Sequence, residues 1–454
     1  MENVVVLLNI EVNITAKQIK RFLWIEKRHE TLRRWQMKLS QTEKEILKII
    51  DGIEIIDCHE HLSPEEDRTS KNLDVFTLFS HYTKGDILRS GMKEEDYNCL
   101  FNKESPVEIR WKKFSPFWKN IRYTSYCRAV LIALEKFYGF DDITEENCGL
   151  ISQRIKEFNK PGIYKKILRD TCNIKTCLTQ CGRTDTGTEL LTPVMPMLYS
   201  LEKKEDLLHP VFEPDASIKT LDDYMEAMER YVVRIKKEGA VGLKMVSLPY
   251  SQTNRNEAES IFQKISSGKM EIPVKKCPFF SSPSPLHSYL IDYGINLAGK
   301  YDMVVAVHTG YWGDFRDLHP LHIIPLLIKY PDVRFDVYHL GYPWVRETLM
   351  LGKGFSNVWL NFCWTHIISQ RFAMDAVDEA IDLVPVNKIL AFGGDYLHTA
   401  LEKVYGHLTM AKEDIARVLA KRMEDGRLKE EQAEYIIKRW FRDNPVELYN
   451  LKLK

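Results

Sequence analysis

The feature that most constrains this chain is a β-prone, mostly apolar run that ends in two histidines. It occupies residues 53–62, IEIIDCHEHL, and contains His59 and His61. On a strand, residues two positions apart lie on the same face, so both imidazoles point to one side. Imidazole is a common ligand of zinc and related divalent ions. The run therefore predicts half of a metal site at the end of the first strand.

Composition limits the partners and the compartment. Lys plus Arg and Asp plus Glu both total 64 in 454 residues, so no overall charge attracts nucleic acid or an anionic membrane. The apolar run at residues 4–10 is too short to span a bilayer and lacks a basic flank. Nine scattered cysteines without a Cys-x-x-Cys pair suit a reducing compartment. We expect a cytoplasmic protein whose partner is a small molecule.

Strand-like and helix-like segments alternate from residue 173 onward, and this alternation predicts the fold. Together with the first strand they make eight strands, which favours a (β/α)8 TIM barrel with its active site at the carboxyl ends of the strands. A doubly wound open sheet is the alternative. The later strands are expected at residues 174–179, 194–197, 240–245, 303–308, 334–339, 357–362 and 388–392.

The segments outside this alternation are helical in pattern. We expect an N-terminal helical extension over 1–52, a barrel over 53–408, and C-terminal helices over 409–454 packed on the barrel. Residues 63–172 form a long helical insertion after strand 1. Because it follows the predicted ligands directly, the insertion is expected to be a lid or a substrate wall.

Three later strands also end in residues that bind metals. His308 and His339 each follow an apolar strand, and Asp395 follows a strand and a Gly393-Gly394 pair. In a barrel these strand ends share one face with the first strand. The predicted metal ligands are His59, His61, His308 and Asp395, and Zn²⁺ is the preferred ion.

Charge and position suggest what these residues would do. A bound cation lowers the pKa of its water toward neutrality, and the resulting hydroxide would be the nucleophile. Asp395, close to the cation, is expected to be ionised and to serve as the general base. His339 would either bind a second metal or polarise a substrate carbonyl.

Weaker candidates lie near other strand ends. His366 follows the seventh strand and is a further catalytic candidate. Arg183, after the second strand, could bind a substrate carboxylate through its guanidinium fork. Lys244 ends the fourth strand and would lie near the substrate, and Trp312 and Trp364 would line the pocket.

From about residue 53 to 451 the sequence resembles the amidohydrolase superfamily, in the branch that includes decarboxylases. The resemblance is strongest in His-Thr-Gly at 308–310, His-Leu-Gly-Tyr-Pro at 339–343 and Phe-Gly-Gly-Asp at 392–395. It implies a (β/α)8 barrel and a metal held by the His-x-His pair after the first strand. It also implies that His308 and His339 correspond to the histidines at the ends of the family's fifth and sixth strands, and Asp395 to the aspartate at the end of its eighth strand. Barrels of this family are often homo-oligomers, so the resemblance also implies that this chain forms a homo-oligomer.

The resemblance raises the question of metal number. Binuclear members carry a fourth-strand lysine modified to a carbamate that bridges two metals, and Lys244 holds that position. An unmodified lysine is cationic and repels a metal. We favour one ion with Lys244 binding a substrate carboxylate, and two ions only if Lys244 is carbamylated.

The resemblance predicts an enzyme, a metal-dependent hydrolase that cleaves a C–N or C–O bond of a small polar, carboxylate-bearing substrate. Three alternatives stay open: a non-oxidative decarboxylase, an isomerase of uronic acids, and a catalytically silent binding module. The helical insertion after the first strand resembles the uronate isomerases, whereas histidines on the fifth and sixth strands favour a hydrolase.

Overall fold

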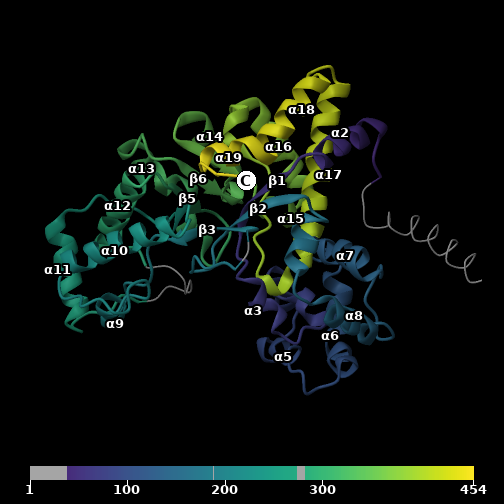
Figure 1. Ribbon diagram of the computed structural model, residues 1–454, viewed down its shortest axis with the longest axis horizontal. Coiled ribbons are helices and arrows are strands. Elements are labelled where there is room, and N and C mark those ends of the chain that lie inside the picture. Colours follow the sequence, from purple (N-terminus) through teal and green to yellow (C-terminus); the bar gives the residue numbers. More distant parts are fainter. Residues whose placement is uncertain (1–37, 188, 274–281, 454) are drawn as a thin grey trace, which may run out of the picture.

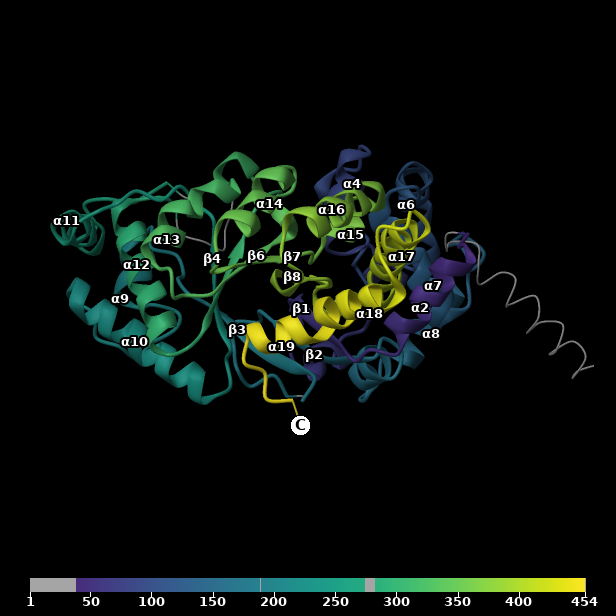
Figure 2. The ribbon, with the colours of Figure 1, turned by 90° about the horizontal axis from the view of Figure 1, so that it is seen from above.

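The computed structural model describes residues 38–187, 189–273 and 282–453. Its centre is a sheet of eight parallel strands in the order β1 to β8 (Figures 1 and 2). The predicted eight-stranded barrel is confirmed. The strands are β1 (Ile55–Glu60), β2 (Ile174–Thr179), β3 (Leu191–Pro196), β4 (Gly242–Val246), β5 (Val304–His308), β6 (Phe335–Tyr338), β7 (Val358–Asn361) and β8 (Ile389–Leu390).

Backbone hydrogen bonds join the first strand to the segment that follows the last. The Cys58 N–H donates to Phe392 O at 2.9 Å, and the Asp395 N–H donates to His59 O at 2.8 Å. These bonds bring the sheet close to closure, and every residue of β1 is buried. The strand with the His-x-His pair and the loop with Asp395 are therefore neighbours.

A helical insertion follows β1, as the sequence predicts. It has its own apolar core, which includes Phe76, Phe79 and Phe114, and its helix α7 packs against α17 (Glu402–Glu424) from the other end of the chain. Figure 1 shows most of it below the C-terminal helices. Its α-helices are α3 (Glu65–Thr69), α4 (Tyr82–Arg89), α5 (Glu94–Cys99), α6 (Val107–Ile121), α7 (Ser125–Tyr138) and α8 (Cys148–Phe158).

The remaining helices surround the barrel and extend beyond it. Between β2 and β3 the described residues contain no helix, whereas two helices, α11 and α12, lie between β4 and β5. These helices are α9 (Lys204–Leu208), α10 (Leu221–Lys237), α11 (Arg255–Ser266), α12 (Pro285–Lys300), α13 (Ile324–Lys329), α14 (Val345–Gly354), α15 (Thr365–Ile368), α16 (Gln370–Leu383), α18 (Glu430–Lys438) and α19 (Asn444–Leu448).

The N-terminal extension is described only in part, because residues 1–37 lie outside the described residues. Helix α2 (Gln41–Asp51) begins at Ser40, whose hydroxyl accepts a hydrogen bond from the Glu43 N–H while the Glu43 carboxylate accepts one from the Ser40 N–H. Its buried face carries Ile46 and Ile50. None of the described helices is long and apolar enough to cross a bilayer.

Candidate metal centre

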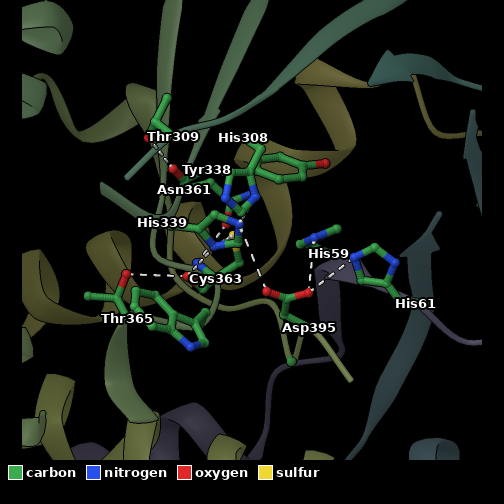
Figure 3. Close-up of polar contacts among 12 residues, drawn as sticks. His59, His61, His308, Thr309, Tyr338, His339, Asn361, Cys363, Thr365 and Asp395 are labelled. Carbon is green, nitrogen blue, oxygen red and sulfur yellow. Dashed lines mark hydrogen bonds and ion pairs between the residues drawn. The ribbon is translucent and has the colours of Figure 1, made fainter. Parts of the chain in front are cut away.

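Three side chains of metal-binding type converge where β1 meets the loop after β8. The imidazoles of His59 and His61 both face the Asp395 carboxylate, with Nε2 to Oδ1 distances of 3.2 Å and 3.3 Å (Figure 3). One ligand atom from each residue lies within 4.8 Å of the other two. Two imidazoles and a carboxylate are a frequent protein contribution to catalytic zinc sites, which keep a further position for water or substrate.

The loop that carries Asp395 approaches β1 so closely that only glycine fits before it. A Cβ at Gly393 would lie 2.8 Å from the His59 backbone nitrogen and 2.5 Å from the Cβ of Cys363, and a Cβ at Gly394 would collide with Oε1 of Glu60. Asp395 itself has a φ of 59°, a left-handed conformation that non-glycine residues seldom adopt. The Gly-Gly-Asp sequence is therefore what lets the carboxylate reach the two histidines.

Two buried carboxyl groups of β1 hold the backbone on both sides of Asp395. The Gly394 N–H donates to Asp57 Oδ1 at 3.2 Å, and the Tyr396 N–H donates to Glu60 Oε2 at 2.6 Å. Burial raises the pKa of Asp57 to about 7 and raises the pKa of Glu60 well above its usual value. Strand β1 thus supplies two imidazoles and also positions the third candidate ligand.

The protonation states of the three residues match metal binding. Burial, assisted by the charge of Lys244, lowers the pKa of His59 well below its ordinary value, and burial also lowers the pKa of His61. Burial alone would raise the pKa of Asp395, but its interactions with His59, His339 and His61 outweigh burial and hold the pKa well below the usual range. Neutral imidazoles and an ionised carboxylate are the forms that bind a metal. The residues therefore fit a divalent cation.

The fifth- and sixth-strand histidines form a separate pair beside this group. Nε2 of His339 lies 3.0 Å from Nδ1 of His308, and 3.9 Å from Oδ2 of Asp395. His308 lies outside the three-residue group, and its buried Nε2 has no hydrogen-bond partner among the described residues. The role of His308 as a metal ligand stays a prediction.

Lys244 reaches the same centre from β4. Its Nζ lies 3.3 Å from Nε2 of His59 and 4.0 Å from the centre of the Tyr338 ring. Burial lowers the pKa of Lys244 to about 8, although the charge of Asp395 opposes this shift. The position leaves both predicted roles open, a carbamate beside the metal and a contact to substrate.

Two predicted aromatic residues also lie here. The Trp312 ring lies 5.2 Å from the His308 ring, and the Trp364 ring lies 5.8 Å from the His339 ring. Both indoles therefore border the histidine pair, in a position to contact a substrate.

The structure places two other candidates elsewhere. His366 is fully buried, with Nδ1 3.0 Å from the Asp414 carboxylate and Nε2 3.3 Å from the Ala391 carbonyl oxygen. Arg183 lies on an exposed loop, where its guanidinium contacts Asp185 at 2.6 Å and Asp67 at 3.6 Å. Neither of these sets of contacts includes a residue of the candidate metal centre, and both side chains are held by partners that their strand-end positions did not reveal.

Tyr82, which the sequence analysis did not single out, contacts Asp395 directly. Its hydroxyl, from helix α4 of the insertion, donates a hydrogen bond to Asp395 Oδ2, and its ring stacks on that of Tyr126 at 5.1 Å. The preceding residue, His81, has a φ of 64° and places its ring 4.0 Å from the Tyr82 ring. The insertion thus contributes a side chain to the centre, consistent with the predicted substrate wall.

Strained backbone gathers around this centre. His81, His339, Trp364 and Asp395 all have φ between 59° and 68°. Such conformations are costly for residues with a Cβ and are found preferentially at functional sites. Sequence patterns do not report backbone strain, so they gave no signal at His81.

The family model described as Amidohydrolase matches residues 220–451, just over half of the chain. The uronate isomerase of Bacillus licheniformis is 24% identical over 266 residues, which are 51% of this chain and 53% of that protein. The match thus spans about half the length of that relative.

Solved structures resemble a larger part of the chain. The uronate isomerase of Thermotoga maritima has a TM-score of 0.72 at 14% identity and covers 90% of this chain and 98% of its own. The glucuronate isomerase of Caulobacter crescentus has a TM-score of 0.70 at 14% identity, with 91% and 94% covered. At this identity the likeness shows the fold alone. The family match, together with the barrel and its cluster of strand-end ligands, establishes that this chain belongs to the amidohydrolase family and is an enzyme of that superfamily.

Proposed function

We propose that this enzyme is a metal-dependent aldose–ketose isomerase whose substrate is a uronate, a small sugar that carries a carboxylate. The partial sequence match to a uronate isomerase supports this choice. So does the shared fold, which extends over nearly the full length of two such enzymes. Of the functions considered from sequence, the isomerase alternative is therefore preferred to the hydrolase.

The observation that carries the proposal is the hydrogen bond from Tyr82 to Asp395. Oδ1 of Asp395 faces His59 and His61, and Oδ2 accepts the Tyr82 hydroxyl. A carboxylate that must take a proton from attacking water needs an oxygen directed at that water. Here the second oxygen is engaged by a phenol, and the two groups form a donor–acceptor pair suited to moving protons between neighbouring substrate oxygens.

Aldose–ketose conversion requires only such proton movements. A proton leaves C2 and one is added at C1, while a hydroxyl proton passes from O2 to O1, so that no water is consumed. A bound divalent cation would supply charge stabilisation to the oxygens at which negative charge develops. Asp395 would accept a proton, Tyr82 would bond to a substrate oxygen, and His339, whose Nε2 lies 3.9 Å from Asp395 Oδ2, would orient a hydroxyl.

A metal-dependent hydrolase is the second candidate, and Lys244 is the observation that favours it. Its Nζ lies close enough to His59 that a carbamate on it would reach the same cation. In that case added bicarbonate would raise both the metal content and the activity. An isomerase with an unmodified Lys244 would show neither response.

The test is incubation of the metal-loaded enzyme with D-glucuronate and D-galacturonate in D2O, followed by NMR. Isomerisation would yield the ketose together with exchange of the carbon-bound proton. Tyr82→Phe should lower the rate about 10²-fold or more. Tyr126→Phe is the matched control, because Tyr126 stacks on Tyr82 but its hydroxyl accepts from the Trp364 Nε1–H at 3.1 Å. Absence of ketose with every uronate tried, or equal rates in the two variants, would contradict the proposal.

A further inference from the structure

Helix α4 carries a second polar side chain toward the mouth of the barrel. Arg89, at its last residue, is exposed, and its Nη2 donates to the Tyr311 hydroxyl at 3.2 Å. Its Nη1 donates to the Gly85 carbonyl oxygen at 3.0 Å. Both hydrogen bonds of this guanidinium are thus to neutral oxygens. Among the described residues it forms no ion pair, although the Asp86 carboxyl group lies near enough to interact with its charge.

The same helix fixes the distance between Arg89 and the candidate metal centre. Tyr82 and Arg89 are seven residues apart, so they lie on one face of α4, about 10 Å apart along its axis. Tyr82 reaches Asp395, whereas Arg89 reaches the loop after β5. One face of α4 therefore extends from the candidate metal centre to the loop after β5.

Aromatic rings line the path between these two points. The Tyr311 ring lies parallel to the Trp364 ring, with an interplanar angle of 7° and a centroid distance of 6.2 Å. The Trp364 ring in turn lies 6.2 Å from the Tyr82 ring and 5.8 Å from the His339 ring. Arg89 is thus connected to the centre through neighbouring aromatic rings, from Tyr311 to Trp364 and then to Tyr82 and His339.

We propose that Arg89, assisted by Tyr311, binds the substrate carboxylate and so selects uronates over neutral sugars. This assignment rests on the proposed function. In an open-chain hexuronate the carboxylate and the carbonyl lie at opposite ends, about 6 Å apart when the chain is extended. With the carbonyl end at Asp395, the carboxylate points along α4 toward the guanidinium. The guanidinium folds back onto the Gly85 carbonyl oxygen, one turn nearer to Tyr82 than the Arg89 backbone. Its planar fork matches two carboxylate oxygens.

Other cations near the centre are less suited to this role. Lys244 lies at the metal end, beside His59. Lys403 is buried and donates to the Ser80 carbonyl oxygen at 2.7 Å. Arg183, the arginine favoured from sequence, already bonds to Asp185. Arg89 combines exposure with the required position, and among the described residues no carboxylate lies within ion-pair distance of its guanidinium.

Gly85 provides the room for this arrangement. A Cβ at Gly85 would lie 2.9 Å from Nη1 of Arg89, so any larger residue would push the guanidinium from its place. Gly85→Ala should therefore weaken carboxylate binding while leaving the charge unchanged.

The experiment compares Arg89→Gln with Lys84→Gln. Lys84 lies on the same helix and carries the same charge, but it pairs with Glu94 at 2.7 Å. In the metal-loaded enzyme, Arg89→Gln should raise KM for a uronate about 10- to 100-fold, whereas KM for the corresponding neutral aldose should stay unchanged. Lys84→Gln should leave both values near those of the wild type. Equal effects in the two variants, or an equal loss for the neutral aldose, would overturn the assignment.

Binding of D-glucarate, a sugar dicarboxylate that cannot isomerise, separates this inference from the proposed function. Calorimetry on the metal-loaded protein should show binding that Arg89→Gln weakens about 10-fold or more. A wild type that binds glucarate in this Arg89-dependent way but isomerises no uronate would refute the proposed function and retain the carboxylate site. Absence of glucarate binding, or binding insensitive to Arg89→Gln, would refute the site.

Discussion

His59 and His61 end one strand, whereas His308 and His339 end two others, and the two pairs differ in what holds them. The first pair faces Asp395 and rests on a strand whose buried carboxyls also position that aspartate. The second pair forms a hydrogen bond within itself. The same residue type at equivalent strand ends thus gains different partners, which leads us to assign the first pair to the cation and the second to the substrate.

The largest expected effect follows from removing the shared partner of the first pair. Asp395→Asn keeps the shape of the side chain but removes the charge that the cation and the proton transfer both require. We expect activity to fall by 10³-fold or more and metal affinity to fall with it. Metal analysis after dialysis against a weak chelator measures the affinity. If Asp395→Asn retained both its activity and its metal affinity, Asp395 would not be a ligand or a catalytic residue of this centre.

Alanine substitution of the second pair sharpens the contrast. His308→Ala and His339→Ala should each lower activity about 10²-fold while metal content stays near the wild-type value, because neither imidazole belongs to the three-residue group. His61→Ala is the comparison, in which the metal should be lost. Loss of metal from His308→Ala would contradict this assignment and support the role of metal ligand that the sequence predicts for His308.

Lys244→Ala tests how many ions the centre holds. With one ion bound by His59, His61 and Asp395, metal content should be about one per chain in both the wild type and the variant, and bicarbonate should change neither. Activity should still fall, because Lys244 lies beside His59. Two ions in the wild type, reduced to one or none in the variant, would show a bridging carbamate.

Glu60 tests whether β1 positions Asp395. Glu60→Ala removes the acceptor of the Tyr396 N–H and should cost about 1–3 kcal/mol of stability together with weaker metal binding. Glu60→Gln keeps an acceptor at the same place and should recover most of the stability and most of the metal affinity. Thermal unfolding and metal titration measure them. Equal behaviour of the two variants would show that the carboxyl merely fills space.

The smallest effect on catalysis is expected at His366. Its hydrogen bonds to Asp414 and Ala391 lie within the buried interior, so His366→Ala should lower stability by about 1–3 kcal/mol without changing metal content. The rate per folded, metal-loaded molecule should stay within a few fold of the wild type. A loss as large as that in His339→Ala would return His366 to the catalytic group.

Sequence periodicity was sufficient to predict the eight strands, because buried parallel strands are short apolar runs separated by helix-length segments. It also predicted that His59, His61, His308 and Asp395 would meet, because barrel closure brings strand ends together. His59, His61 and Asp395 do form one group, whereas His308 lies outside it. Tyr82 and Arg89 could not be found in this way. They lie in an insertion whose path depends on packing against α17, and nothing local links residue 82 to residue 395.

Position at a strand end also does not determine which way a side chain points. His366 lies five residues after β7, on helix α15, whereas His308 ends β5 and His339 directly follows β6. Asp414, 48 residues later on α17, supplies a buried partner for the His366 ring. Arg183 follows β2, but Asp185 lies only two residues away, and its carboxylate accepts a hydrogen bond from the Arg183 guanidinium. In both cases a carboxylate that lies nearby in the fold determines where the side chain points.

The most direct test is anomalous X-ray scattering at the absorption edge of the bound metal, from crystals of the metal-loaded enzyme. The account predicts one peak per chain, coordinated by His59 Nε2, His61 Nε2 and Asp395 Oδ1, with Tyr82 remaining bonded to Oδ2. A peak held by His308 and His339, or crystals of loaded protein with no peak at β1, would contradict it.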